Sequence, residues 1–171
     1  MTKKNLTLQV NIIPIVTSYI IAATINSVTS ETVKESAVVK DMEREVKIVK
    51  LEAFFDKYNS PLRENAEDFV TAAEKYDMDY KLLPAIACME SSCGKNLIQG
   101  SYNPFGWGIY GTQAIYFKDY TEAIDIVGKG ISENYITKGY DSPEEIAPIY
   151  TPPNHVHWLS GVKFFINEIE G

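Results

Sequence analysis

Apolar side chains recur three and four positions apart through much of this chain, which is the spacing of a helix with one buried face. This spacing is clearest over residues 65–76, 82–87, 124–135 and 158–169. The last run carries a stripe that we expect in the core, made of Trp158, Val162, Phe165, Ile166 and Ile169. The pattern therefore predicts a mainly helical domain.

Residues that start or stop helices lie at the ends of these runs. Asp77 or Asp79 can cap the helix that contains Leu82, and Gly94 is a natural stop for it. Thr121 can cap the following helix. A capping box with proline at the first helical position predicts one more short helix, at Ser142-Pro143-Glu144-Glu145.

One segment between the helices has a different composition. Between Gly106 and Phe117, glycines alternate with residues that favour strands: Trp107, Ile109, Tyr110, Ile115 and Tyr116. This composition predicts a short β-hairpin.

The N-terminal residues, 1–30, have the pattern of an export signal. Lys3 and Lys4 precede an uncharged, largely apolar stretch, and cleavage is expected after Ser30, with Val28 and Ser30 as the small residues. An uncleaved membrane anchor is the first alternative, although several polar residues weaken it. A buried helix of the domain is the second, which the basic start disfavours.

Residues 31–52 alternate in charge sign, which indicates a linker or stalk, either a solvated helix or a loose segment. The apolar repeat in it is too brief to identify a coiled coil. The remaining residues, 53–171, are long enough for one folded domain. The expected organisation is therefore an export segment, a stalk and one catalytic domain.

Composition narrows the class of function. The chain has 171 residues, 45% of them hydrophobic, and a formal charge of −7. That charge argues against nucleic-acid binding, and the sequence contains no phosphate-binding loop or dinucleotide fingerprint. We therefore expect no nucleic-acid partner and no cofactor, and we expect a monomer.

The strongest candidate for chemistry is Glu90. It lies near the end of an apolar helical run, where the helix dipole and apolar neighbours disfavour the carboxylate and raise its pKa. A raised pKa suits a general acid at neutral pH. The alternative is an ordinary surface glutamate. A loop rich in aromatic, amide and glycine residues follows soon after, over residues 101–108, and favours the catalytic interpretation.

Several motifs occur in a recognisable order: Leu83-Pro84-Ala85-Ile86-Ala87-Cys88-Met89-Glu90-Ser91-Ser92, Gly94-Lys95, Tyr102-Asn103-Pro104-Phe105-Gly106-Trp107-Gly108, Tyr150-Thr151-Pro152-Pro153, and Trp158 with Val162. Residues 54–170 thereby resemble the lysozyme-like superfamily, closest to small lytic transglycosylase and bacterial glucosaminidase domains. The resemblance implies an α+β lysozyme-like fold, a helical domain with a β-hairpin lobe flanking a glycan cleft. It also implies that Glu90 is the catalytic acid and that Tyr150 lines the cleft. The two cysteines beside the acid depart from the family pattern.

The mechanism that we expect uses one carboxyl group, because residues 91–118 contain no Asp or Glu. Most glycosidases use two. Glu90 would protonate the glycosidic oxygen while the N-acetyl group of the substrate assists, and the resemblance implies an anhydro product. Hydrolysis by water is the alternative, and Asp119 and Glu122 are the nearest later acids.

Five residues are expected to bind substrate: Ser101, Asn103, Phe105, Trp107 and Tyr150. The amide of Asn103 can hold an N-acetyl group or orient the acid, or it can simply form a turn with Pro104. Phe105 and Trp107 suit either a sugar platform or core packing. Tyr150 can bond the acetamide or the acid, or bury its ring.

The cysteines lie on either side of the acid, at Cys88 and Cys93. In a straight helix they would be roughly 7.5 Å apart along the axis, so a disulfide requires a break between Met89 and Ser92. Export favours that disulfide. A metal site with His155 and His157 matches no zinc spacing, so no metal is expected.

The function expected from these features is cleavage of β-1,4 bonds in peptidoglycan or a related N-acetylhexosamine glycan. The protein would be secreted, periplasmic or anchored outside the cytoplasmic membrane. A non-catalytic glycan-binding or surface scaffold module is the alternative.

Overall fold

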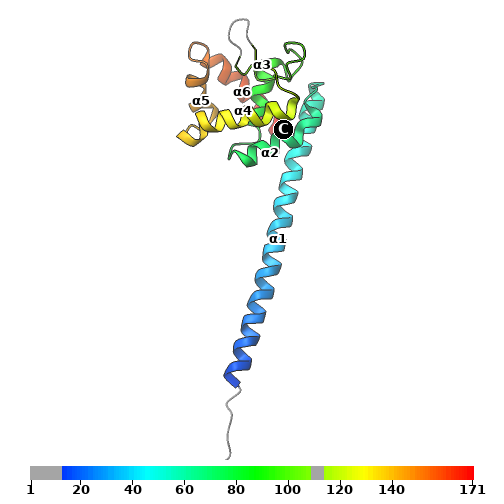
Figure 1. The fold of residues 1–171 in the computed structure, drawn as a ribbon, viewed down its shortest axis with the longest axis vertical. Coiled ribbons are helices and arrows are strands. Elements are labelled where there is room, and N and C mark those ends of the chain that lie inside the picture. The colour runs from blue at the N-terminus through cyan, green and yellow to red at the C-terminus, as the bar shows by residue number, and fades with distance from the viewer. Residues whose placement is uncertain (1–12, 109–113) are drawn as a thin grey trace, which may run out of the picture. The chain divides into compact units, whose positions relative to one another are not determined.

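The computed structural model describes residues 13–108 and 114–171, with side chains from residue 34 onward. Six α-helices are present in the described part of the chain (Figure 1): α1 Ile13–Lys57, α2 Ala66–Lys75, α3 Leu82–Ser91, α4 Tyr120–Asn134, α5 Pro143–Tyr150 and α6 His155–Glu170. Short 3-10 turns cover Arg63–Asn65 and Ile136–Lys138.

The chain divides into two compact units, Met1–Glu43 and Arg44–Gly171. The described part of the first unit is α-helical backbone. No helix in the described residues combines the length and the hydropathy that crossing a membrane requires. Lys3 and Lys4, on which the expected export signal depends, lie outside the described residues.

The core of the second unit forms around α3. Seven consecutive residues of this helix, from Leu82 to Cys88, are buried, because other elements cover it on all sides. The helix α6 packs against α3 and α5. Trp158, Val162 and Ile169 are buried in the core, with Phe165 and Ile166 packed against it, so the expected stripe is confirmed.

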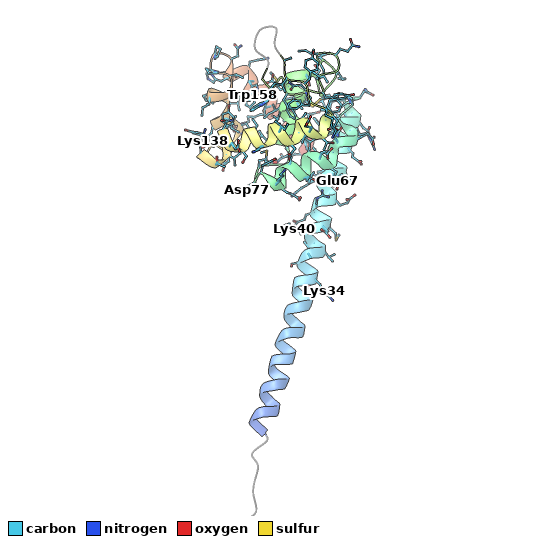
Figure 2. All side chains as sticks on the ribbon, in the orientation of Figure 1. Lys34, Lys40, Glu67, Asp77, Lys138 and Trp158 are labelled. Carbon is cyan, nitrogen blue, oxygen red and sulfur yellow. A yellow bond between two sulfur atoms is a disulfide. The ribbon has the colours of Figure 1, made fainter. Side chains whose placement is uncertain are left out.

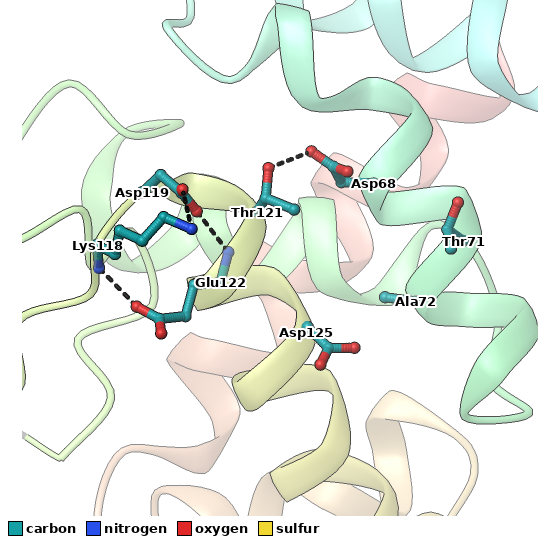
Figure 3. A pocket seen from close by; sticks show the side chains of 8 residues that line it. All are labelled: Asp68, Thr71, Ala72, Lys118, Asp119, Thr121, Glu122 and Asp125. Carbon is teal, nitrogen blue, oxygen red and sulfur yellow. Dashed lines mark hydrogen bonds and ion pairs between the residues drawn. The ribbon is translucent and has the colours of Figure 1, made fainter.

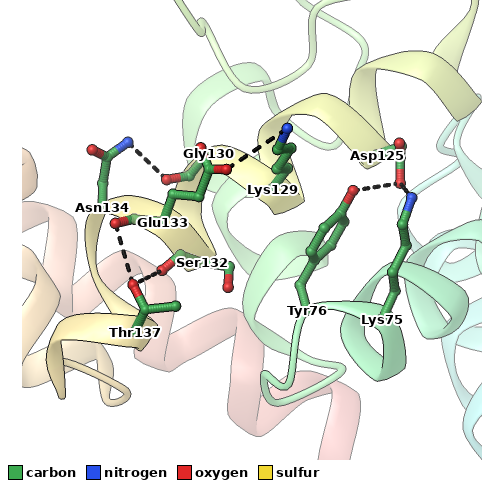
Figure 4. A network of polar contacts seen from close by, with 9 residues as sticks. All are labelled: Lys75, Tyr76, Asp125, Lys129, Gly130, Ser132, Glu133, Asn134 and Thr137. Carbon is green, nitrogen blue, oxygen red and sulfur yellow. Dashed lines mark hydrogen bonds and ion pairs between the residues drawn. The ribbon is translucent and has the colours of Figure 1, made fainter.

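Polar contacts join α2 to α4 at the surface (Figure 4). The Asp125 carboxylate accepts hydrogen bonds from Tyr76 Oη at 2.8 Å and from Lys75 Nζ at 2.6 Å. The Tyr76 ring also lies so close to Gly128 that a Cβ atom there would be 3.1 Å from it. These contacts hold α2 and α4 together, and the two helices also pack against each other.

The helix caps agree in part with the sequence. The capping box of α5 is confirmed, and the Glu145 carboxylate accepts hydrogen bonds from Ser142 N and Oγ at 3.3 and 2.8 Å. The expected Thr121 cap is wrong. Asp119 is the N-cap of α4 because its backbone is extended and its Oδ1 accepts a hydrogen bond from Glu122 N at 2.8 Å.

The expected α+β class is also wrong, because the described residues contain helices and loops but no β-strand or sheet. Residues 106–108 and 114–117, where the hairpin was predicted, form a loop, and residues 109–113 lie outside the described residues. Gly106 and Gly108 have φ values of 61° and 65°, which turn the backbone out of an extended conformation. Side-chain hydrogen bonds from Asn103 then take the place of a strand ladder.

Candidate active site

An open pocket of about 590 Å³ lies within the second unit, with Glu90 in its wall. Its other walls come from the loop after α3, the end of α4 and the end of α5. The lining residues are Glu90, Phe105, Gly106, Trp107, Gly108, Ile115, Asn134, Tyr135, Tyr150 and Thr151. Four of the six residues expected in the catalytic and substrate sites therefore come together here: Glu90, Phe105, Trp107 and Tyr150.

Glu90 is the second-last residue of α3, and its carboxyl group is held by a tryptophan of α6. Trp158 Nε1 donates a hydrogen bond to Glu90 Oε1 at 2.9 Å. Trp158 lies among the packed helices (Figure 2) and is only 3% exposed. The bond therefore joins a residue at the pocket to a side chain that belongs to the core.

The pKa of Glu90 is raised above the ordinary value for a glutamate. Glu90 opens onto solvent at the pocket, but the protein around its carboxyl group disfavours the charged form. The hydrogen bond from Trp158 acts in the opposite direction and lowers the pKa. Glu90 thus retains a proton to a higher pH than an exposed glutamate, which a general acid requires.

Tyr150 forms an aromatic stack behind the acid. Its ring centroid is 4.9 Å from that of Trp158, with an interplanar angle of 34°, and 6.2 Å from that of Tyr135. Burial raises the pKa of Tyr150, and the nearby negative charge of Glu90 raises it further. Tyr150 is therefore a neutral phenol at physiological pH, able to donate a hydrogen bond.

Asn103 and Ser101 do not line the pocket, and they build the loop that does. Asn103 Nδ2 donates to Trp107 O at 2.9 Å and to Ile115 O at 3.2 Å, while its Oδ1 accepts from Trp107 N at 3.0 Å. Ser101 Oγ accepts from Asn103 N at 3.2 Å. Both residues are buried, so the amide of Asn103 is occupied by the backbone.

The two aromatic residues of this loop that line the pocket have different positions. Phe105 is 1% exposed, and its ring packs edge-on against Phe69 at 6.4 Å, as expected for a core residue. Trp107 is partly exposed at the pocket, and its ring lies over α4. It fits there because residue 130 is glycine, where a Cβ atom would be only 2.5 Å from Trp107 Cζ2. Of these two residues, Trp107 is therefore the one whose side chain a ligand in the pocket can reach.

The structure joins Cys88 and Cys93 in the expected disulfide. The helix ends at Ser91, and Ser92, Cys93 and Gly94 then adopt left-handed φ values of 53°, 59° and 79°. This reversal brings the two cysteine Cα atoms to 3.6 Å from each other. The regular helix therefore ends between Met89 and Ser92, as the disulfide required. Ser91 Oγ stabilises the turn by accepting a hydrogen bond from Gly94 N at 2.9 Å.

Glu90 is the only carboxylate among the described residues that line this pocket. Asp119 and Glu122, the nearest later acids in the sequence, line a different pocket of about 460 Å³ (Figure 3). Their oxygens accept hydrogen bonds from backbone N–H groups at the start of α4. The described lining thus contains one acid and no second carboxyl partner.

Sequence reasoning gave no role in the site to Trp158, Asn134, Tyr135 or Thr151. Trp158 was expected only as a core residue. A buried indole N–H usually finds a hydrogen-bond partner, and this requirement could have indicated that Trp158 bonds to a polar side chain. Asn134, Tyr135 and Thr151 also line the pocket. Nothing in the local sequence of Asn134 and Tyr135 indicates it, whereas Thr151 follows Tyr150 in a motif that was recognised. Thr151 Oγ1 is buried and has no hydrogen-bond partner among the described residues.

Compared with known proteins, this chain matches no protein-family model and no curated protein. The lysozyme-like resemblance therefore stays a prediction from the motifs. The functional argument depends on those motifs and on the geometry of the pocket.

Proposed function

We propose that this protein cleaves β-1,4 glycosidic bonds of peptidoglycan, with Glu90 as the general acid and then the general base. The observation that carries the proposal is one carboxyl group with a raised pKa in the wall of an open, aromatic-lined pocket. The pocket volume of about 590 Å³ is within the range of small-ligand sites. An open pocket also suits a polymer, whose chain must extend beyond the bound sugar.

The chemistry follows from having one acid. Protonated Glu90 gives its proton to the glycosidic oxygen as the bond from that oxygen to the sugar C1 breaks. The carbonyl oxygen of the neighbouring N-acetyl group bonds to C1 and takes up the positive charge. Glu90, now a carboxylate, accepts the proton of the 6-hydroxyl as its oxygen bonds to C1 and releases the acetamide. The products are a shortened strand and an anhydro sugar end.

Water can replace the 6-hydroxyl in the last step, which gives a reducing sugar end. Both routes use Glu90 twice, and neither needs a second carboxylate. The described lining of the pocket is consistent with either route, and we propose the anhydro route because the motifs around Glu90 resemble lytic transglycosylases.

The remaining lining residues suit an acetamido sugar. Trp107, Tyr135 and Tyr150 offer aromatic surfaces, which stack against the apolar faces of sugar rings. Asn134 uses Nδ2 to donate to Gly130 O at 2.8 Å, so its Oδ1 can accept the N–H of an acetamide. This residue takes over the role predicted for Asn103, whose amide is occupied.

The direct test is incubation of the purified protein with cell-wall sacculi, followed by mass analysis of the soluble products. We expect muropeptides with anhydro ends, and at least an ~10²-fold loss of product with Glu90→Gln, the effect of removing a general acid. Products with reducing ends would favour hydrolysis. Tight binding to sacculi with no cleavage by the unaltered protein would refute the enzyme and support a glycan-binding module.

We also propose that the protein acts outside the cytoplasm, because its substrate lies there. The Cys88–Cys93 bridge supports this location, since disulfides persist in oxidising compartments. N-terminal sequencing of the protein from its native host should find either a new N-terminus after Ser30 or an intact chain in the membrane fraction. An intact chain in the cytosol would contradict the proposed location.

A further inference from the structure

We infer that Trp158 is a positioning residue that determines which oxygen of Glu90 carries the catalytic proton. The inference rests on the proposed glycan cleavage and extends it to a residue that does not line the pocket. It is carried by the hydrogen bond from Trp158 Nε1 to Glu90 Oε1, at 2.9 Å.

The argument begins with the chemistry of the indole group. An indole N–H donates a hydrogen bond and cannot accept one. A neutral carboxylic acid has one carbonyl oxygen, which accepts well, and one hydroxyl oxygen, which carries the proton. The oxygen that faces the indole, Glu90 Oε1, is therefore the carbonyl oxygen, and the proton is on Oε2.

The second step concerns the other oxygen. Among the described residues, Glu90 Oε2 has no hydrogen-bond partner within the protein. Glu90 lines the pocket, so its unbonded oxygen is the one available to a bound ligand. The indole thus keeps the acidic proton on the oxygen that can reach a glycosidic bond.

The third step is that the indole is held rigidly. Trp158 is 3% exposed, and its ring stacks on Tyr150 with centroids 4.9 Å apart. The helix that carries it approaches α3 closely, since a Cβ atom at Gly161 would be 2.2 Å from Met89 Sδ. The indole therefore cannot follow a rotation of the carboxyl group, and rotation of Glu90 would break the bond.

The bond also favours the transfer of the proton. Hydrogen bonds to a charged acceptor are stronger than those to a neutral one. As Glu90 loses its proton, the bond from Trp158 strengthens and stabilises the carboxylate that forms. Removal of the N–H should therefore lower kcat by about 10- to 100-fold, the range for a hydrogen bond to a charged group.

The test compares Trp158→Phe with Trp107→Phe, the same substitution at the other tryptophan of the chain. Glu90 acts in its protonated form, so kcat/KM falls as the pH rises through its pKa. Loss of the indole bond raises that pKa, so the basic limb of the Trp158→Phe profile should move to higher pH as kcat falls. Trp107→Phe should raise KM and leave the pH of the basic limb unchanged. Lower activity of Trp158→Phe with an unmoved limb would mean that Trp158 acts only through packing, and would overturn the inference.

A second measurement is independent of activity. In the Trp107→Phe variant one indole N–H remains, so its nitrogen-15 NMR signal belongs to Trp158. That signal should shift with pH as Glu90 titrates, and Glu90→Gln should abolish the titration. A signal that does not respond to Glu90 would overturn the inference even if the enzyme cleaves glycan. If the signal titrates but no glycan is cleaved, the contact is real and the proposed function fails, and with it the catalytic role of Trp158.

Discussion

Asn103 is the residue on which the loop beside Glu90 most depends, and replacing it gives the most direct test of the fold around the pocket. Asn103→Leu keeps a similar side-chain volume and removes three hydrogen bonds, two donated by Nδ2 and one accepted by Oδ1. Each hydrogen bond contributes about 0.5–1.5 kcal/mol net, so the expected loss in the free energy of unfolding is about 3 kcal/mol. The loss is this large because Asn103 is 4% exposed and water cannot replace its bonds without opening the loop.

The assay is urea unfolding followed by circular dichroism, with Asn134→Leu as the matched control. Asn134 is exposed and makes one side-chain hydrogen bond, so its replacement should cost under about 1 kcal/mol. Asn103→Asp sharpens the test because it keeps the acceptor but sets a carboxylate against two carbonyl oxygens. It should destabilise the protein at least as much as Asn103→Leu at neutral pH. If all three variants unfold at the same urea concentration, the loop does not depend on this amide and the reasoning is refuted.

Three further predictions concern other contacts. Gly130→Ala should displace the Trp107 ring, because a Cβ atom would be 2.5 Å from it, and should raise KM severalfold; an unchanged KM and tryptophan fluorescence would contradict this. Thiol counting in denaturant without reductant should find no free cysteine, and detection of two would exclude the Cys88–Cys93 bridge. The hydrogen bond from Lys75 lowers the pKa of Asp125 in the folded protein. The Asp125 carboxylate therefore stabilises the protein at any pH above the pKa that Asp125 has in the unfolded chain. This contribution is lost as the pH falls through the lower pKa that Asp125 has in the folded protein. Asp125→Asn should therefore lower the free energy of unfolding at pH 7, by under about 1 kcal/mol because Asp125 is half exposed, and make no difference at about pH 2.

The helices were predictable because each carries its own signal. Residues 66–75 of α2 and the stripe on α6 follow from periodicity alone, and the α5 capping box follows from four adjacent residues. The position of the acid near the end of α3 was predictable for the same reason, since Leu82 to Cys88 form an unbroken apolar run. These are local patterns, and local hydrogen bonds and burial decide them.

The errors arise where distant residues decide the structure. Strand propensity predicted a hairpin after Gly106, but such propensity depends on context, and here the Asn103 side chain takes the backbone hydrogen bonds that a ladder would need. Asp119 and Thr121 both suit a cap, and Thr121 instead donates to Asp68 Oδ2 on α2 at 2.8 Å. No local pattern indicates that partner. No local pattern indicates the hydrogen bond from Trp158 to Glu90 either, because 68 positions separate the two residues.

The close approach of Met89 to Gly161 has a consequence for motion. The acid and its tryptophan donor belong to α3 and α6, and at this contact a side chain on one helix fills the space left by glycine on the other. Neither helix can slide along the other without opening a void or a clash, so α6 holds in place the end of α3 that carries Glu90. Trp107, which lines the same pocket from another segment, is flanked by two glycines with left-handed backbone. In the proposed mechanism Glu90 would therefore keep its place while Trp107 adjusts to the bound sugar.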